Sequence, residues 1–238
     1  MGERVRLVTY NIRKGKGASG RERQITALGR ALESHKLDVV LCQEVFHTRT
    51  PGASQSALLA QALDMRAYYE PNKQRRIGHH GNATFTRLAV ERLKNYDIST
   101  NRIERRGALY LKLQLGSRPL HILNVHLGLN ERQRITQISR IETIIALSCA
   151  SDDAVILAGD FNDWTRRLDS LITHGLAFQN AFAHLRRAES STWHARRPLF
   201  NLDRVYVRNV TVRRTRRLNG HPWRDLSDHL PLWVELEI

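Results

Sequence analysis

Apolar residues recur along the chain with two spacings, one typical of buried strands and the other typical of helices. Short apolar or alternating runs predict strands over residues 5–10, 38–44, 83–87, 108–115, 120–125, 154–158, 202–207 and 230–236. Apolar residues at helical spacing predict helices over residues 25–35, 54–65 and 131–148. The pattern therefore indicates a mixed α/β protein.

Two further features complete this outline. In the helix over 131–148, the expected buried stripe consists of Ile135, Ile138, Ile141, Ile145 and Leu147. The polar, basic segment 73–80 predicts a loop that could face substrate. Because no internal repeat, long linker or low-complexity tract interrupts the 238 residues, we expect one domain over residues 1–238.

Polar residues with catalytic side chains occur at the ends of the predicted strands. These residues are Asn11, Glu44, His126, Asp160, Asp203, Asp228 and His229. Side chains at strand ends can converge on one mouth, where catalytic and binding residues often lie. The sequence therefore predicts one shared active site.

The side chains at these positions favour a hard cation. Asn11, Glu44, Asp160 and Asn162 offer only oxygen ligands, which suit Mg²⁺, or Mn²⁺, better than zinc. Such an ion would neutralise the charge of a phosphate group. We expect a divalent metal site.

The remaining groups suit attack of water on phosphorus. Asp160, with Asn162 two residues later, could hold the attacking water in line. His229 could stabilise charge on the phosphoryl oxygens if a carboxylate such as Asp203 fixes its tautomer and keeps it protonated. Taken alone, Asp203 could equally form a salt bridge with Arg204, and Glu44 could be a surface carboxylate.

Seven motifs in order along the chain resemble those of the endonuclease/exonuclease/phosphatase superfamily. They are Thr9-Tyr10-Asn11, Gln43-Glu44, Gly81-Asn82-Ala83, Asn124-Val125-His126, Gly159-Asp160-Phe161-Asn162, Leu202-Asp203-Arg204-Val205 and Ser227-Asp228-His229. The resemblance implies a four-layered α/β sandwich with two mainly antiparallel sheets packed together and flanked by helices. It also implies a divalent metal at one end.

The resemblance assigns roles to individual residues. The metal ligand is Glu44 with help from Asn11, and Asp228 lies near the metal. The catalytic residues are His126, Asp160, Asn162, Asp203 and His229, of which His126 would contact the phosphate. For Asn82 and Arg106, contact with substrate and the shaping of a turn are both open, whereas His79, His80 and His121 are expected to be loop or packing residues.

The variant motifs narrow the resemblance. Glu44 is followed by Val45-Phe46 rather than the Thr-Lys of abasic-site repair enzymes, and His126 stands where those enzymes have a tyrosine. The chain looks closer to the branch with deoxyribonuclease-like, sphingomyelinase-like and inositol-phosphatase-like enzymes, and resembles a small bacterial group within it.

Charge adds information about the substrate. The chain has 38 Lys and Arg against 23 Asp and Glu, a formal net charge of +15, and arginine pairs well with phosphate oxygens. The charge favours an anionic phosphoester as substrate, with DNA or RNA slightly preferred. Two alternatives remain: peripheral contact with anionic lipid, and a basic surface that is simply solvated. We expect a Mg²⁺-dependent phosphodiesterase. The alternative enzyme is a phosphoesterase that acts on phospholipid headgroups or inositol phosphates. The alternative that is not an enzyme is a noncatalytic anion-binding module.

The remaining expectations concern the cellular setting. Cys42 and Cys149 lie in apolar runs without metal-binding spacing, so we expect two buried thiols. The opening residues lack the pattern of a secretory signal, and no apolar run is long enough to span a bilayer. We therefore expect a cytoplasmic protein, acting as a monomer.

Overall fold

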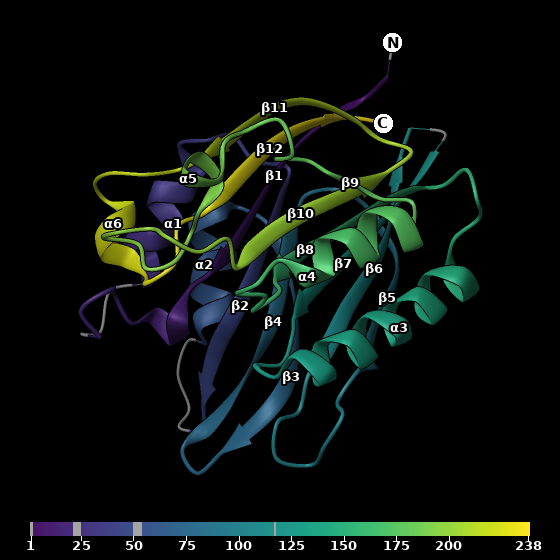
Figure 1. Cartoon of the computed structure of the whole chain (residues 1–238). Helices are drawn as coiled ribbons and strands as arrows, with labels where there is room; N and C mark the ends of the chain where they lie inside the picture. Colours follow the sequence, from purple (N-terminus) through teal and green to yellow (C-terminus); the bar gives the residue numbers. More distant parts are fainter. Residues whose placement is uncertain (1, 21–24, 50–53, 117) are drawn as a thin grey trace.

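The computed structural model describes residues 2–20, 25–49, 54–116 and 118–238, and its strands form two six-stranded sheets (Figure 1). In spatial order, the first sheet contains β11 (Thr211–Arg217), β12 (Leu232–Glu237), β1 (Arg4–Asn11), β2 (Val39–Thr48), β4 (Gly78–Thr86) and β3 (Arg66–Arg75). The second contains β5 (Val90–Asp97), β6 (Gly107–Leu115), β7 (Arg118–His126), β8 (Ala154–Asp160), β10 (Asp203–Arg208) and β9 (Gln179–Asn180). Among the described strands, β1 and β2 pair in parallel, as do β7 and β8, and the other pairs are antiparallel.

Helices cover the outer faces of both sheets. The helices are α1 (Ile25–Glu33), α2 (Gln55–Leu63), α3 (Glu131–Ser148), α4 (Arg167–Ser170), α5 (Arg187–Ser190) and α6 (Trp223–Leu226). Residues of α1, α2 and α6 form one apolar cluster with the first sheet, and residues of α3 and α4 form another with the second sheet. A third cluster fills the space between the sheets. Three apolar interfaces make four layers, so the expected sandwich with mainly antiparallel sheets is confirmed.

Strand alternation explains how one sequence serves two interfaces. In β1, Val5 and Leu7 belong to the cluster between the sheets, whereas Val8 and Tyr10 belong to the cluster under the helices. Successive side chains of a strand point to opposite faces, so both faces of this strand are buried and apolar. Asn11, at the strand end, falls in register with the face between the sheets.

The segment 73–80 is not a loop, and that prediction was wrong. Lys73 to Arg75 end β3, and Gly78 to His80 begin β4, with Lys73 paired to His80 in an antiparallel hairpin. The segment is polar because much of the hairpin end is exposed, and polarity alone does not separate a hairpin tip from a loop.

Four strands were not predicted: β3, β5, β9 and β11. They are the four edge strands of the two sheets. Strand β5 has the sequence VERLKNYD and β11 has TVRRTRR, and both expose most of their side chains. Charged, exposed edges protect a sheet from pairing with other chains, and that same polarity hides an edge strand from a search for apolar runs.

The buried stripe of α3 also differs from the prediction. Ile135 and Leu147 are 46% and 83% exposed, respectively, whereas Ile144 is buried. At the start of the helix the buried positions are polar, since Gln137 Oε1 accepts a hydrogen bond from Gly128 N at 2.8 Å and Arg134 donates to Leu129 O at 2.6 Å. These two side chains tie the helix to the loop after β7, a role that apolar periodicity cannot reveal.

Two further features concern the cysteines and the possibility of a membrane-spanning helix. Cys42 is buried as expected, but Cys149 is only partly buried. Within the described residues, no helix has the length and apolar character needed to cross a bilayer.

Gly159 provides a test of the sheet geometry. A Cβ atom there would lie 1.9 Å from Val125 O, and the residue has φ +141°, so both the contact and the backbone require glycine. We expect Gly159→Ala to lower the free energy of unfolding by ~2 kcal/mol or more, measured by urea denaturation. Gly175→Ala is the matched control because its Cβ would meet only Leu171 Cδ1, at 3.8 Å. Equal stability of the two variants would contradict the strand pairing described here.

Candidate active site

Residues that the sequence placed at strand ends meet at one end of the space between the sheets. The inward-facing series of β7 and β8 end in His126 and Asp160, and that of β10 begins with Asp203. Asp203 pairs with Asp160, and Asp160 pairs with His126, across neighbouring strands. Alternate residues of these strands face the space between the sheets. In the core these residues are apolar, such as Ile156 and Val205, and at the strand ends they are the polar residues of the site.

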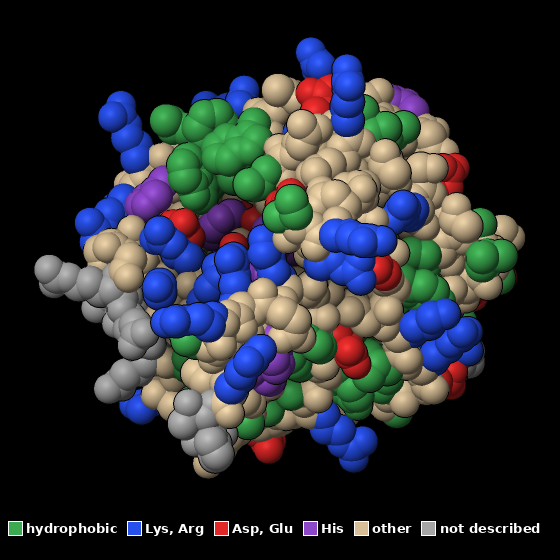
Figure 2. All heavy atoms as spheres, turned by 90° about the horizontal axis from the view of Figure 1, so that it is seen from below, with side chains coloured by type: hydrophobic (Ala, Val, Ile, Leu, Met, Phe, Trp, Pro, Cys, Tyr) green, Lys and Arg blue, Asp and Glu red, His purple; other side chains and the backbone are tan. Residues whose placement is uncertain are grey.

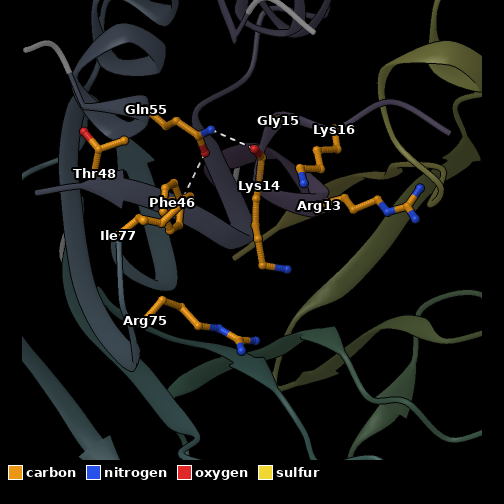
Figure 3. Close-up of a pocket in the computed structure, with 9 residues that line it drawn as sticks. All are labelled: Arg13, Lys14, Gly15, Lys16, Phe46, Thr48, Gln55, Arg75 and Ile77. Atoms are coloured by element: carbon orange, nitrogen blue, oxygen red, sulfur yellow. Dashed lines mark hydrogen bonds between the residues drawn. The ribbon is translucent and has the colours of Figure 1, made fainter. Parts of the chain in front are cut away.

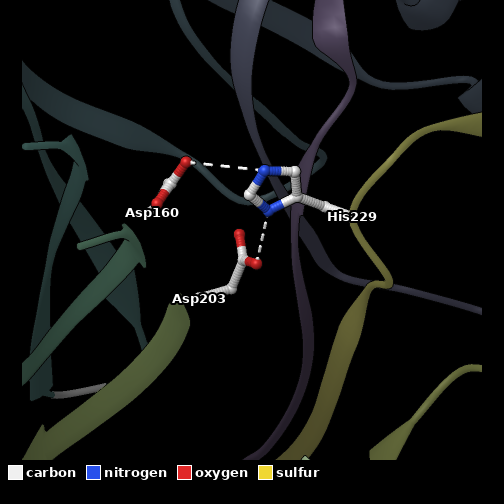
Figure 4. Close-up of side chains that lie close together, drawn as sticks. All are labelled: Asp160, Asp203 and His229. Atoms are coloured by element: carbon white, nitrogen blue, oxygen red, sulfur yellow. Dashed lines mark hydrogen bonds and ion pairs between the residues drawn. The ribbon is translucent and has the colours of Figure 1, made fainter. Parts of the chain in front are cut away.

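At the centre of the site, His229 lies between two carboxylates (Figure 4). Its Nδ1 atom is 2.7 Å from Asp203 Oδ2, and its Nε2 atom is 3.9 Å from Asp160 Oδ2. All three residues are buried. The contact of Asp203 with His229 is the one that the resemblance implies, and Arg204 pairs with Asp163 at 3.0 Å rather than with Asp203.

The charges of this group oppose the effect of burial on the histidine. Burial lowers the pKa of His229, but Asp203, Asp160 and Asp228 together outweigh it and raise the pKa to about 10. Burial raises the pKa of Asp160 to about 6, with Asp203 adding to the rise and His229 opposing it. His229 is therefore an imidazolium at neutral pH, with its Nε2–H directed towards Asp160.

His126 has the opposite character. Its Nε2 atom is 3.5 Å from Asp160 Oδ2, yet burial and the nearby cations Arg106 and His229 hold its pKa well below the usual range. The ring is therefore neutral. It can exchange a hydrogen bond with a phosphate or with Asp160 without adding a charge to the site.

Two amides hold Asp160 in place. Asn11 Nδ2 donates to Asp160 Oδ2 at 2.9 Å, and the backbone N–H of Asn162 donates to Asp160 Oδ1, also at 2.9 Å. Asn162 has φ +49° and its side chain donates to Leu127 O at 3.0 Å. The carboxylate therefore has a defined orientation, and the side-chain nitrogen of Asn162 is used to fix the loop that carries it.

Glu44 reaches the site through a bulge in β2. The register between β2 and β4 shifts between Cys42 and Val45, and Glu44 has φ +56°, a conformation that is uncommon for residues other than glycine. Lys14 pairs with its carboxylate, and although burial raises the pKa of Glu44, the Lys14 charge outweighs it and lowers the pKa. Such local strain is frequent at functional positions.

The predicted metal ligands are oxygen donors with cationic neighbours. Asp228 Oδ2 lies 3.2 Å from Arg13 Nε, and the Oδ1 atom of Asn11 accepts from Arg13 N at 3.0 Å. Among the described residues, Asp160, Asp203 and His229 hold possible ligand atoms within 4.8 Å of one another. A protonated imidazole has no free lone pair for a metal, so the Glu44 side of the site, with its carboxylate and amide oxygens, fits Mg²⁺ better.

The two residues left open by the sequence behave differently. Asn82 Nδ2 donates to Gly107 O at 3.2 Å and to Asn124 O at 3.0 Å, so its amide nitrogen fixes backbone at the interface of the sheets. Arg106 pairs with Glu104 at 2.6 Å and lies near enough to affect the pKa of His126. Of the two, Arg106 is the better placed to meet an anionic substrate.

Several residues at the site were not assigned from the sequence. Arg13 and Lys14 contact the predicted ligands, as described above. His80 is buried beside Glu44, and burial lowers the pKa of His80 to about 4. In contrast, His79 bonds to Tyr69 and His121 to Tyr110, both at 2.8 Å. Only the glycines near Arg13 and Lys14 mark that turn in the sequence, and they do not indicate which side chains turn inward.

An aromatic corner adjoins the histidine. Trp193 forms a β-bridge with His229, and its ring packs edge-on against Trp164, which also contacts Phe200. Seen from below, one face of the molecule has a hollow that exposes acidic and His side chains between Lys and Arg side chains and a hydrophobic patch (Figure 2). The hollow therefore has charged walls beside an apolar one.

Comparison with known proteins identifies the family and the fold of the chain. The Endonuclease/Exonuclease/phosphatase family matches residues 8–229. The chain belongs to this family. It is 30% identical over 244 residues to the uncharacterized protein YbhP of Escherichia coli (strain K12), and the match covers 98% of this chain and 96% of YbhP.

Solved structures of the same fold include enzymes with different names. The mannosyl-6-phosphatase Bt3783 of Bacteroides thetaiotaomicron superposes with a TM-score of 0.77 at 18% identity, covering 98% of this chain and 100% of that one. TDP2 of D. rerio, in complex with a single-strand DNA product, superposes with a TM-score of 0.75 at 15% identity, covering 99% and 100%. At these identities the likeness shows a shared fold.

The contact between Asp203 and His229 yields a test of the electrostatics in this family member. Asp203→Asn removes the strongest opposing charge while burial persists, so we expect the pKa of His229 to fall from about 10 towards its ordinary value of about 6.5. The ring C–H signals of His229 in an NMR titration report this pKa. Asp64→Asn is the control, because Asp64 is an exposed partner of Arg87. A pKa unchanged in Asp203→Asn would show that the pair does not control the charge of His229.

Proposed function

We propose that this chain is a Mg²⁺-dependent phosphodiesterase that cleaves P–O bonds by in-line attack of water. Membership of the family indicates phosphoester hydrolysis, and the buried group of His229 between Asp203 and Asp160 carries the more specific proposal. That group supplies a fixed positive charge and, beside it, a carboxylate with an elevated pKa. Attack of water on phosphate requires both, since the charge stabilises the phosphoryl oxygens and the carboxylate accepts the proton of the water.

In this mechanism His229 donates a hydrogen bond from Nε2 to a phosphoryl oxygen, where negative charge increases as the bond to water forms. Asp203 keeps the imidazolium charged and oriented through Nδ1. Asp160, held by Asn11 and Asn162, orients the water and accepts its proton. The new P–O bond forms as the P–O bond to the leaving alcohol breaks, and the leaving oxygen takes a proton from solvent. A bound Mg²⁺ would neutralise phosphate charge, and Glu44, Asn11 and Asp228 are the residues that would hold it.

The noncatalytic alternative is less well supported. Asp160, Asp203, His126 and His229 are all buried, and burying ionisable groups costs several kcal/mol each unless they are compensated. A binding module for anions gains nothing from placing two carboxylates at its centre, because they would repel the ligand. A perturbed, buried cluster at a strand-end mouth is instead typical of an active site.

The choice of substrate rests on charge. The net charge of +15 favours a polyanion such as DNA or RNA over a neutral-headed ester. The named neighbours include both a sugar phosphatase and a protein bound to a DNA product, so the shared fold is compatible with either class. A phospholipid headgroup or inositol phosphate is the second candidate, supported by the apolar wall beside the basic one.

The first test of this function is mutational. Asp160→Ala and His229→Ala should each lower the rate of hydrolysis of bis(p-nitrophenyl) phosphate by at least about 100-fold, because each removes a group that acts in the transition state. Release of p-nitrophenol in MgCl₂ is the measurement, and EDTA should abolish it.

Asp152→Ala and His184→Ala are matched controls on exposed loop positions and should retain full activity. Calorimetry on the folded wild-type protein distinguishes the enzyme from the noncatalytic anion-binding module. Absence of Mg²⁺ and Mn²⁺ binding, together with no turnover of mono- or diesters, would favour the anion-binding module.

The substrate class has its own test. Binding of a polynucleotide releases counterions, so the logarithm of the affinity should fall linearly with the logarithm of salt, by roughly 0.7 per phosphate contacted on a single strand. Fluorescence anisotropy of a labelled oligonucleotide at increasing KCl measures this slope. A flat dependence would remove nucleic acid from the proposal and leave the small phosphoesters.

A further inference from the structure

A cavity of about 670 Å³ adjoins the candidate active site. Its walls come from the turn after β1, from β2, from the first residue of α2 and from the end of the β3–β4 hairpin (Figure 3). Two contacts connect it to the predicted metal ligands, since Lys14 pairs with Glu44 and Arg13 with Asp228. The cavity is thus a side chamber of the same mouth.

Cations line this chamber on two sides. Arg13, Lys14 and Lys16 come from the turn, and Arg75 comes from the hairpin. Figure 3 shows Lys14 and Arg75 extending from opposite walls towards the same space. None of the described residues that line the chamber is acidic, and the carboxylates of Glu44 and Asp228 meet Lys14 and Arg13 at its edge.

Two of the four cations have no acidic partner among the described residues. Within the described parts of the chain, no ion pair is found for Lys16 or Arg75, although many other arginines pair with carboxylates. Burial lowers the pKa of the neighbouring Lys73, and the positive charges of Arg75, Arg106 and Lys14 contribute to that shift. The repulsion among these groups would be relieved by a bound anion.

The chamber has a fixed wall. Gln55 Nε2 donates to Lys14 O at 2.9 Å, and Gln55 Oε1 accepts from Phe46 N at 2.8 Å. Gly15 has φ +74°, and a Cβ atom there would lie 2.9 Å from Gln55 Nε2 and from Ile25 Cδ1. The turn that carries the three cations is therefore locked against β2, and Phe46 and Ile77 give it an apolar surface for the organic part of a ligand.

We propose that this chamber binds a second phosphate of the substrate, distinct from the phosphate that is hydrolysed. Lys16 and Arg75 are the residues that hold it, one from each wall. The inference rests on the proposed function. It narrows the possible substrates to phosphoesters that carry a second phosphate close enough to the hydrolysed one to reach the chamber. Such a group comes from the adjacent nucleotide of a polynucleotide or from a small polyphosphorylated molecule, and both offer the same chemistry to the cations.

Binding can be tested without catalysis. Inorganic phosphate is titrated into the full-length, ¹⁵N-labelled protein in MgCl₂, and backbone amide signals are followed by NMR. We expect saturable shifts at Gly15, Lys16, Ile77 and Gly78, with a dissociation constant raised about tenfold or more in Arg75→Gln and in Lys16→Gln. Arg66→Gln, at the opposite end of β3, is the control and should match the wild type. Absence of these shifts, or equal affinity in all four proteins, would overturn the proposal.

Steady-state kinetics then show whether the second phosphate belongs to a polynucleotide or to a small polyphosphorylated molecule. KM is measured for a tetrathymidylate and for inositol trisphosphate in the wild type, Arg75→Gln and Lys16→Gln. A rise of about tenfold in KM with little change in kcat, for one of the two substrates, assigns the class. If phosphate binds the chamber but neither substrate is hydrolysed, the proposed function fails while the subsite stands. If a substrate is hydrolysed with unchanged KM in both variants, the subsite fails while the function stands.

Discussion

The candidate active site depends on a set of amide hydrogen bonds that joins the two sheets directly behind it. Gln43 Nε2 donates to Asn124 Oδ1 at 2.8 Å, and Asn124 Nδ2 donates to Ala83 O at 2.9 Å. Asn82 Nδ2 returns a bond to Asn124 O at 3.0 Å. The main cluster between the sheets is apolar, and apolar contacts tolerate small shifts. Buried amides do not, because a lost partner costs about 1–3 kcal/mol, so these bonds fix how β7 sits against β2 and β4.

This fixed spacing explains how charges from both sheets can act together. Asn11 belongs to the first sheet and Asp160 to the second, and they meet at 2.9 Å. His229 precedes β12 of the first sheet and contacts Asp203 of the second at 2.7 Å. A shift of one sheet by an ångström would break both contacts. Precise sheet packing is therefore a condition for the raised pKa of His229, and so for its charge at neutral pH.

The sequence predicted the central strands and the placing of the candidate catalytic side chains at strand ends for the same physical reason. A buried strand has period two, and its last inward residue must reach the mouth, as Asp160 does. What the sequence could not reveal depends on tertiary context. Edge strands such as β5 and β11 are polar because they face solvent, and the bulge that turns Glu44 inward leaves no apolar signature. The pairing of Arg13 with Asp228 joins turns far apart in the chain.

The division between strands and turns also separates the residues proposed to act in hydrolysis from those proposed to bind a second phosphate. Asp160, Asp203 and His126 lie on strands of the second sheet, where a change of backbone would disturb the core. The cationic chamber is built from a turn and a hairpin end, where Lys16 and Arg75 are exposed and can change at little cost in stability. Substrate choice can therefore diverge while the hydrolytic group stays constant. One fold can in this way accommodate phosphoesters of different size and charge, with the identity of the substrate determined at the rim of the site.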